Sequence, residues 1–235
     1  MNILTGFGQF YYEAKRNKWF GYFTVFCRVV LAIGFIPSGI VKIMGERFTA
    51  LPVNHPLGHY FEALHLTGYY YTFIGVIQLT AAILLLIPRS ALLGALIYFP
   101  IILNICILAY AVRFEGTRIT TLMLLANIYL LSWDYDRLKS ILPFKQSTED
   151  SYTTNEKASI SKFPFLFFGC VFAIIASIIV INHFLYDIRP GNSLLECRNS
   201  CSDRACEDFC ACIYNEGKPL HNCLDEYEKA KQPEK

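Results

Sequence analysis

The chain has 235 residues, of which 54% are hydrophobic, 15% are aromatic and only 17% are charged. This composition argues against two large soluble domains, and a net charge of +2 without a basic run argues against nucleic acid as a partner. The expected fold class is an all-α membrane protein in a lipid bilayer. It would have a four-helix transmembrane bundle, a fifth transmembrane helix and a small disulfide-rich C-terminal tail.

Five segments follow one another along the chain. Residues 1–19 are predicted as an amphipathic cytoplasmic lead, residues 20–133 as the four-helix bundle, and residues 134–162 as a polar cytoplasmic linker. The fifth transmembrane helix is predicted in residues 163–186, and the cysteine-rich extracytoplasmic tail in residues 187–235.

The first apolar run, from Phe20 to Met44, is too long for a cleavable signal and predicts a retained helix. Gly34, Ser38 and Lys42 recur at every fourth position, so they share one helix face. Small residues on this face allow a neighbouring helix to come close, and we expect Lys42 to face protein and not lipid.

The segment from Glu46 to Gly68 is mixed in character and holds three of the five histidines. If it contains a short helix, then His59, Glu62 and His65 lie along one side of it and could bind a metal ion. The alternative, which we favour, is an interfacial helix with its apolar residues in the lipid and its polar residues among the headgroups.

Two uncharged apolar arms follow between Tyr69 and Val112, joined by the turn Pro88-Arg89-Ser90. Each arm is long enough to cross about 30 Å of hydrocarbon, and the short turn makes the two helices antiparallel neighbours. The next apolar run, from Ile119 to Trp133, is short for a membrane span. Trp133 favours it as a crossing because it would anchor the run at an interface.

Basic residues in the flanks of these runs predict the orientation. With the N-terminus inside, nine flank the predicted spans on the inner side: Lys15, Arg16, Lys18, Arg89, Arg137, Lys139, Lys145, Lys157 and Lys162. Only three precede the tail on the outer side: Arg47, Arg113 and Arg118. The positive-inside rule therefore predicts a cytoplasmic N-terminus and, after five crossings, an extracytoplasmic tail.

The tail contains six of the nine cysteines: Cys197, Cys201, Cys206, Cys210, Cys212 and Cys223. An even number of close cysteines in a segment too small for its own core indicates a disulfide scaffold outside the reducing cytosol. By their spacing, Cys197 and Cys201 are expected to share one face of a helical turn, as are Cys206 and Cys210. A short helical hairpin closed by bridges is therefore expected, with the turn at Gly217, while the pairing stays open among 15 possibilities. The weaker alternatives to structural disulfides are a metal site and a site of thiol exchange.

Polar residues within the apolar runs are the candidate ligand-binding residues: Lys42, Gln78, Asn104 and Asn127. A buried lysine with amide partners could hold an oxygen-bearing headgroup such as a quinone, or an anionic ligand. The alternative is hydrogen bonding between helices, which stabilises a bundle without any ligand. No metal ligand and no catalytic residue is predicted, since no hydrolase, metalloprotease or nucleotide-binding motif is present.

Two motifs stand out between Val25 and Trp133: Gly39-Ile40-Val41-Lys42 in the first predicted helix, and Leu85-Leu86-Ile87-Pro88-Arg89 at the end of the second. With these motifs the stretch resembles the DoxX-like family of small integral membrane proteins, which includes DoxD- and MauE-related members. The resemblance implies a four-helix bundle in the bacterial inner membrane, family-typical positions for Lys42 and Gln78, and a link to respiratory or thiol redox systems.

The expected function is therefore that of a redox-associated membrane component, either quinone-linked or serving an extracytoplasmic thiol system. The alternative is a non-catalytic subunit or scaffold whose disulfide-stapled tail docks an extracytoplasmic protein partner.

Overall fold

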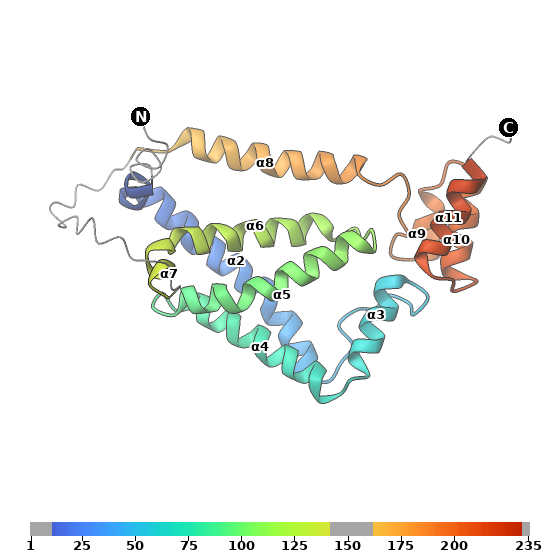
Figure 1. Cartoon of the computed structure of the whole chain (residues 1–235), viewed down its shortest axis with the longest axis horizontal. Coiled ribbons are helices and arrows are strands. Elements are labelled where there is room, and N and C mark those ends of the chain that lie inside the picture. The colour runs from blue at the N-terminus through green and yellow to red at the C-terminus, as the bar shows by residue number, and fades with distance from the viewer. Residues whose placement is uncertain (1–10, 142–161, 232–235) are drawn as a thin grey trace.

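The structure is a computed structural model that describes residues 11–141 and 162–231. The described residues form helices and contain no strand, which confirms the all-α prediction (Figure 1). Most of the lead, residues 1–10, and most of the linker, residues 142–161, lie outside the described residues.

A bundle of four helices forms the centre of the molecule: α2 (Lys18–Ile43), α4 (Tyr69–Leu86), α5 (Ala91–Ala111) and α6 (Thr117–Trp133). Its core contains a stacked ring pair, Phe35 of α2 against Tyr98 of α5, with the ring centres 3.6 Å apart. The Tyr98 hydroxyl donates to the Leu31 carbonyl of α2 at 3.3 Å, which joins the same two helices by a polar contact.

Helices α2 and α4 form the most extensive helix contact in the bundle, and their backbones approach closely at two glycines. A Cβ atom built on Gly39 would lie 2.9 Å from the Gly75 carbonyl oxygen, and one built on Gly75 would lie 2.8 Å from the Gly39 carbonyl oxygen. The buried stripe of α4 includes Tyr71, Gly75 and Gln78, and small residues in it let the two backbones approach. Lys42 is buried against this stripe, as predicted.

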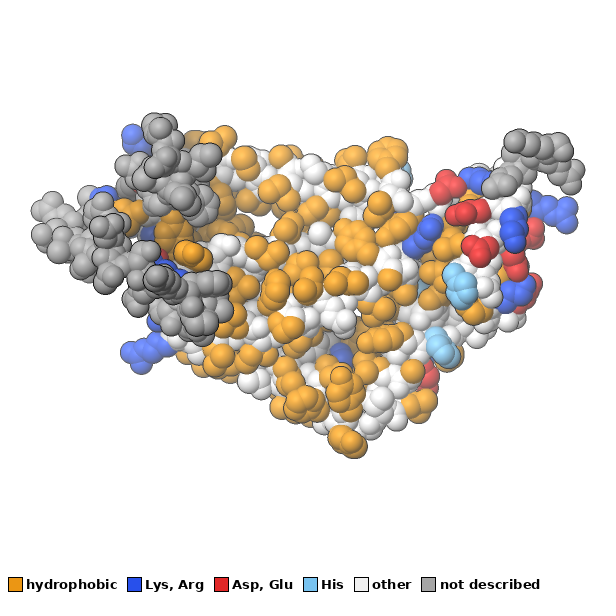
Figure 2. All heavy atoms as spheres, in the orientation of Figure 1, with side chains coloured by type: hydrophobic (Ala, Val, Ile, Leu, Met, Phe, Trp, Pro, Cys, Tyr) orange, Lys and Arg blue, Asp and Glu red, His pale blue; other side chains and the backbone are white. Residues whose placement is uncertain are grey.

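Within the part of the chain that the structure describes, four helices are long and apolar enough to cross a membrane: α2, α4, α5 and α8 (Phe165–Phe184). The predicted membrane character is therefore supported, while the predicted count of five crossings is not confirmed. The helix in doubt is α6, because it has only 17 residues. On the face that Figure 2 shows, apolar side chains cover the bundle and α8, and charged side chains gather over the tail.

The five long helices alternate in direction, so the two ends of the bundle collect different segments (Figure 1). At one end the Asn17 side-chain amide donates to the Lys162 carbonyl at 2.9 Å, and Tyr11 donates to the Trp133 carbonyl at 2.9 Å. At the other end Tyr186, just after α8, donates to the Tyr110 carbonyl of α5 at 2.8 Å. The described part of the lead and the tail therefore lie at opposite ends.

Helix α8 lies beside the bundle and packs mainly on α6, and most of its side chains are exposed (Figure 1). Near its start α8 also contacts α2 through aromatic rings, with Phe167 4.4 Å from Phe20 and 5.4 Å from Phe23, measured between ring centres. An apolar helix with so much exposed surface is suited to face lipid on several sides.

The tail contains three short helices: α9 (Leu194–Asn199), α10 (Arg204–Tyr214) and α11 (Leu220–Lys231). Ser193 and Asp203 cap α9 and α10 by accepting hydrogen bonds from backbone N–H groups at 3.2 Å and 2.8 Å. The chain turns between α10 and α11 with Gly217 at φ 65°, a backbone conformation that favours glycine.

Three disulfides hold the tail together and confirm the predicted scaffold. They join Cys197 to Cys210, Cys201 to Cys206, and Cys212 to Cys223. The last closes the α10–α11 hairpin as expected. The expected helical turn shared by Cys197 and Cys201 is not observed, since α9 ends before Cys201.

The tail is attached to loops at its end of the bundle. The Asn54 side chain donates to the Tyr214 carbonyl at 2.9 Å, and the Arg113 guanidinium donates to the Ile188 carbonyl at 3.3 Å. His55 is fully buried close to Tyr214. Burial lowers the pKa of His55, and its interaction with the Gly191 backbone opposes this change.

Candidate functional site

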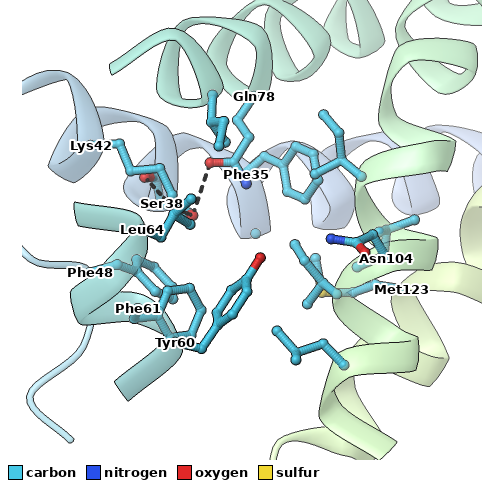
Figure 3. Close-up of a pocket in the computed structure, with 16 residues that line it drawn as sticks. Phe35, Ser38, Lys42, Phe48, Tyr60, Phe61, Leu64, Gln78, Asn104 and Met123 are labelled. Atoms are coloured by element: carbon cyan, nitrogen blue, oxygen red, sulfur yellow. Dashed lines mark hydrogen bonds between the residues drawn. The ribbon is translucent and has the colours of Figure 1, made fainter. Parts of the chain in front are cut away.

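Three of the four predicted ligand-binding residues line one cavity. Lys42 of α2, Gln78 of α4 and Asn104 of α5 surround a space of about 200 Å³ (Figure 3). Short helix α3 (Pro56–His65) and the loop before it cover the cavity with Phe48, Tyr60, Phe61 and Leu64. The cavity therefore lies at the same end of the bundle as the tail.

Lys42 has only 3% of its surface exposed. Its ammonium group donates to the Ser38 hydroxyl at 2.7 Å and to the Ser38 carbonyl at 3.2 Å, and it lies 4.2 Å from the ring centre of Phe48. Within residues 11–141 and 162–231 no carboxylate forms an ion pair with it. A cation kept from water without an opposing charge is costly, unless something in the cavity compensates it.

The other polar side chains around the cavity also have hydrogen-bond donor groups that are not used within the described chain. Ser38 donates to Gln78 Oε1 at 3.2 Å, which leaves the Gln78 amide N–H groups free of partners within the described chain. Asn104 and the Tyr60 hydroxyl likewise form no hydrogen bond with the residues that the structure describes. In Figure 3 the Tyr60 hydroxyl and the Asn104 amide point into the cavity from α3 and α5.

The cover of the cavity is held in place by Arg47 and Tyr71. Arg47 forms an ion pair with Glu62 at 3.0 Å and donates to the carbonyls of Leu51 and Gly58. The Tyr71 hydroxyl accepts from the Phe48 N–H and donates to the Glu46 carbonyl, both at 3.0 Å. These bonds fix the loop and α3 over the bundle, so the aromatic wall of the cavity is preorganised.

Asn127 does not line this cavity. It is fully buried on α6, and its amide donates to the Ala95 carbonyl of α5 at 3.2 Å, while its carbonyl oxygen has no hydrogen-bond partner in the structure. This geometry corresponds to the alternative of hydrogen bonding between helices.

The histidine-rich segment is arranged as a cover and not as a metal site. Glu62 is paired with Arg47, and the His65 ring packs edge-on against Tyr71 with 5.3 Å between ring centres. In the described residues one group of three possible metal ligands comes together, Cys201, Cys206 and Cys210, and all three sulfurs are in disulfides.

The aromatic wall was not predicted from the sequence. Phe48, Tyr60 and Phe61 lie in the segment from Glu46 to Gly68, where the favoured expectation was an interfacial helix that places apolar residues such as Phe61 in the lipid. Aromatic residues near a membrane surface fit that expectation as well. Three aromatic residues within a short polar segment were the available signal, but the pattern alone does not distinguish a lipid-facing side chain from one that covers a cavity.

No family model matches the chain, and no solved structure matches it. The chain is similar to the uncharacterized protein YwoB of Bacillus subtilis (strain 168), with 35% identity over 130 residues. The match covers 53% of this chain and 83% of YwoB. An identity of this level over most of the relative shows common descent, and the chain therefore belongs to the same family as YwoB.

Proposed function

We propose that this protein is a redox-associated membrane component whose bundle binds a quinone headgroup in the cavity beside Lys42. One observation carries the proposal: a buried ammonium group without an opposing carboxylate in the described chain borders a cavity with further unused donors. The predicted resemblance to DoxX-like proteins, with their link to respiratory redox systems, is part of this proposal.

The chemistry of the cavity suits a ligand that accepts hydrogen bonds. The Lys42 ammonium, the Gln78 and Asn104 amides and the Tyr60 hydroxyl can all donate, and they lie around the cavity on three helices. A quinone ring carries carbonyl oxygens on opposite edges, so donors on different sides can bind both. Hydrogen bonds from an ammonium group are the stronger kind, and they strengthen as negative charge builds up on a reduced quinone oxygen.

The volume of the cavity and the side chains that line it suit the ring of a quinone. A cavity of about 150 Å³ accepts benzene in a protein interior, so the present space of about 200 Å³ would hold one substituted ring. The walls are mainly aliphatic and aromatic, as in sites for apolar ligands. Asn104 is exposed on α5, which would leave room at this side for an apolar chain to extend into the bilayer.

The proposed setting is a bacterial inner membrane, with the N-terminus in the cytoplasm and the tail outside. The alternation of the five long helices supports this, because it places the tail opposite the described part of the lead. The disulfides support it too, since such bonds persist outside the reducing cytosol.

A second candidate function is that of a non-catalytic subunit whose tail docks an extracytoplasmic protein. The observation in its favour is the firm attachment of the tail, through Asn54 to Tyr214 and through Arg113 to Ile188, which presents it as a fixed platform. A tail that only docks a partner leaves the Lys42 cavity without a role, so the first proposal accounts for more of the molecule.

The test is quinone binding by the full chain in mild detergent. Organic extraction of freshly purified protein is expected to yield about one quinone per chain, and a short-chain benzoquinone and naphthoquinone are then titrated onto the emptied protein. Lys42→Met should weaken binding about tenfold or more, because a hydrogen bond from a charged donor contributes roughly 1.5–3 kcal/mol. Asn127→Ala is the matched control, a buried polar residue away from the cavity, and should bind as the wild type does.

Two results would overturn the proposal. The first is a wild-type protein that neither contains nor takes up either quinone. The second is an equal affinity for Lys42→Met and the wild type, which would show that the lysine does not contact the ligand.

A further inference from the structure

Two of the three disulfides in the tail lie against each other. The Sγ atom of Cys201, which is bonded to Cys206, lies 3.6 Å from the Sγ atom of Cys210, which is bonded to Cys197. The sulfurs of Cys201, Cys206 and Cys210 all lie within 4.8 Å of one another. This is the contact distance at which a thiolate released from one bridge can attack the other, since disulfide exchange needs direct sulfur–sulfur approach.

One of these bridges borders a groove. Cys206 lines a space of about 530 Å³ between the tail and the end of the bundle, together with polar residues that include Arg113, Arg189 and Lys231. Cys206 also lies in the first turn of α10. A thiolate at the start of a helix is stabilised by the helix dipole, which favours the release of Cys206 from a mixed disulfide once that disulfide has formed.

The third bridge differs in its surroundings. Cys212 and Cys223 are buried in the tail core, as the cysteines of the other two bridges largely are, but neither lines the groove. Their bridge closes the α10–α11 hairpin, a structural role. The chain therefore contains a built-in comparison between an adjacent pair of bridges and an isolated one.

We propose that the adjacent bridges form a thiol–disulfide relay that accepts two electrons from an extracytoplasmic peptide dithiol. A thiolate of the dithiol enters the groove and attacks Cys206 Sγ, so the Cys201–Cys206 bond breaks and Cys201 leaves as a thiolate. Cys201 then attacks Cys210 Sγ across the 3.6 Å contact, which forms Cys201–Cys210 and releases Cys197 as a thiolate. The second thiol of the peptide resolves the mixed disulfide and releases Cys206.

The reaction is balanced. The peptide dithiol becomes a disulfide, the tail exchanges two bridges for one, and two electrons and two protons end on Cys197 and Cys206. The reverse sequence returns the tail to its oxidised form when the peptide partner arrives as a disulfide. The relay is a function of the tail and does not depend on a ligand in the Lys42 cavity, whose lining contains no cysteine.

The relay predicts a crossed bridge, Cys201–Cys210, that the resting protein lacks. Full-length wild-type protein in detergent is treated with a limiting amount of a peptide dithiol, quenched with an alkylating reagent at low pH, digested and mapped by mass spectrometry. The expected product carries the crossed bridge, with Cys197 and Cys206 alkylated and Cys212–Cys223 intact.

Two variants test the same contact without an added thiol. Cys206→Ser leaves Cys201 as a free thiol, and Cys197→Ser leaves Cys210 free, so each should yield the crossed bridge by internal exchange. Cys212→Ser is the matched control: it also leaves one free thiol, at Cys223, but no second bridge lies in contact with it in the described residues, so the adjacent bridges should keep their pairing.

The proposal fails if limiting dithiol gives only fully paired and fully reduced protein without the crossed bridge. It fails equally if stoichiometric metal on four free thiols is found in freshly isolated wild-type protein, because no bridge would then be present to exchange. A failure to bind quinone would leave these results unchanged, so the two proposals are tested separately.

Discussion

The contact between Gly39 of α2 and Gly75 of α4 allows a sharp test of the bundle. A Cβ atom on Gly75 would lie 2.8 Å from the Gly39 carbonyl oxygen and 2.8 Å from Lys42 Cβ. Carbon contacts are normally about 3.5–4.0 Å, so an alanine here needs a displacement of roughly 1 Å. Neither neighbour can rotate away, because one is backbone and the other is the first atom of its side chain.

Gly75→Ala should therefore push α2 and α4 apart. Overpacking of this kind costs about 1–3 kcal/mol, which outweighs the roughly 0.5–1 kcal/mol that alanine gains over glycine within a helix. Since 1 kcal/mol corresponds to about 2–4 °C in a chain of this size, the melting temperature should fall by a few degrees. Lys42 would be displaced too, so quinone affinity should fall in the same variant.

The matched controls are Gly21→Ala and Gly169→Ala. Both glycines lie within helices, and a Cβ atom built on either would have no neighbour within 4 Å. These variants keep the helix gain without the clash, so their melting temperatures should stay level or rise by about 1–4 °C. Thermal unfolding of the three variants is followed in one detergent. An unchanged or higher melting temperature for Gly75→Ala would refute the close α2–α4 contact.

Three further predictions concern other parts of the molecule. Lys42→Met should leave the unliganded protein as stable as the wild type or more so, by up to about 3 kcal/mol, because the variant no longer buries a cation; a clear loss of thermal stability would instead make the lysine structural. Cys212→Ser should destabilise the α10–α11 hairpin by about 3 kcal/mol, the value for a loop of 11 residues, as measured by hydrogen exchange of α11. Burial lowers the pKa of His55, so the folded form resists protonation, and the contact between its loop and the tail should weaken as pH falls below about 6.5. His55 caps α3, because its ring Nδ1 accepts a hydrogen bond from the Leu57 N–H at 3.1 Å. Hydrogen exchange at Leu57 between pH 7.5 and 5 checks the prediction, and His55→Asn, which keeps a capping side chain, should remove the dependence.

The helices and the bridges could be predicted because each depends on a local or compositional signal. Long uncharged runs permit little except a helix in a membrane, and six cysteines in a short polar tail indicate disulfides. The pairing could not be predicted, because it depends on which helix faces approach each other in space. Cys201 shows this: its spacing from Cys197 suggested a shared helical turn, but α9 ends earlier and Cys201 pairs forward to Cys206.

The candidate site was predictable one residue at a time, but its assembly was not. Lys42, Gln78 and Asn104 stood out because a polar group in an apolar run is costly, and they share one cavity. Asn127 gave the same signal yet bonds to Ala95 elsewhere in the bundle. Spacing within one helix fixes which residues share a face, but it does not fix which neighbouring helix that face meets.

Helix α6 shows why the number of membrane crossings could not be settled by hydropathy. Its 17 residues span about 25 Å, a little short of the hydrocarbon core, and they include polar side chains. It packs against α2, α5 and α8, so much of its surface meets protein, where polar groups find partners. The Thr117 hydroxyl donates to the Ala109 carbonyl at 3.2 Å, and the Thr121 and Tyr110 hydroxyls form a hydrogen bond at 3.1 Å.

Hydropathy measures how favourably a helix is transferred into lipid. A helix that mostly contacts other helices can therefore have a lower hydropathy and still cross the membrane. A small shortfall in length is accommodated by local thinning of the bilayer or by flanking anchors, and Trp133 ends the helix. The direction of α6 decides on which side of the bundle α8 begins. Helix α6 runs from the end of the bundle where Tyr110 lies to the opposite end, where Tyr11 lies, and α8 then runs back to the end that carries the tail. If α6 crosses the membrane, the sulfurs of the tail lie on the side opposite the N-terminus. The bridges and the relay proposed for them both require that placement, so modification of tail lysines in intact cells by an impermeant reagent would test it directly.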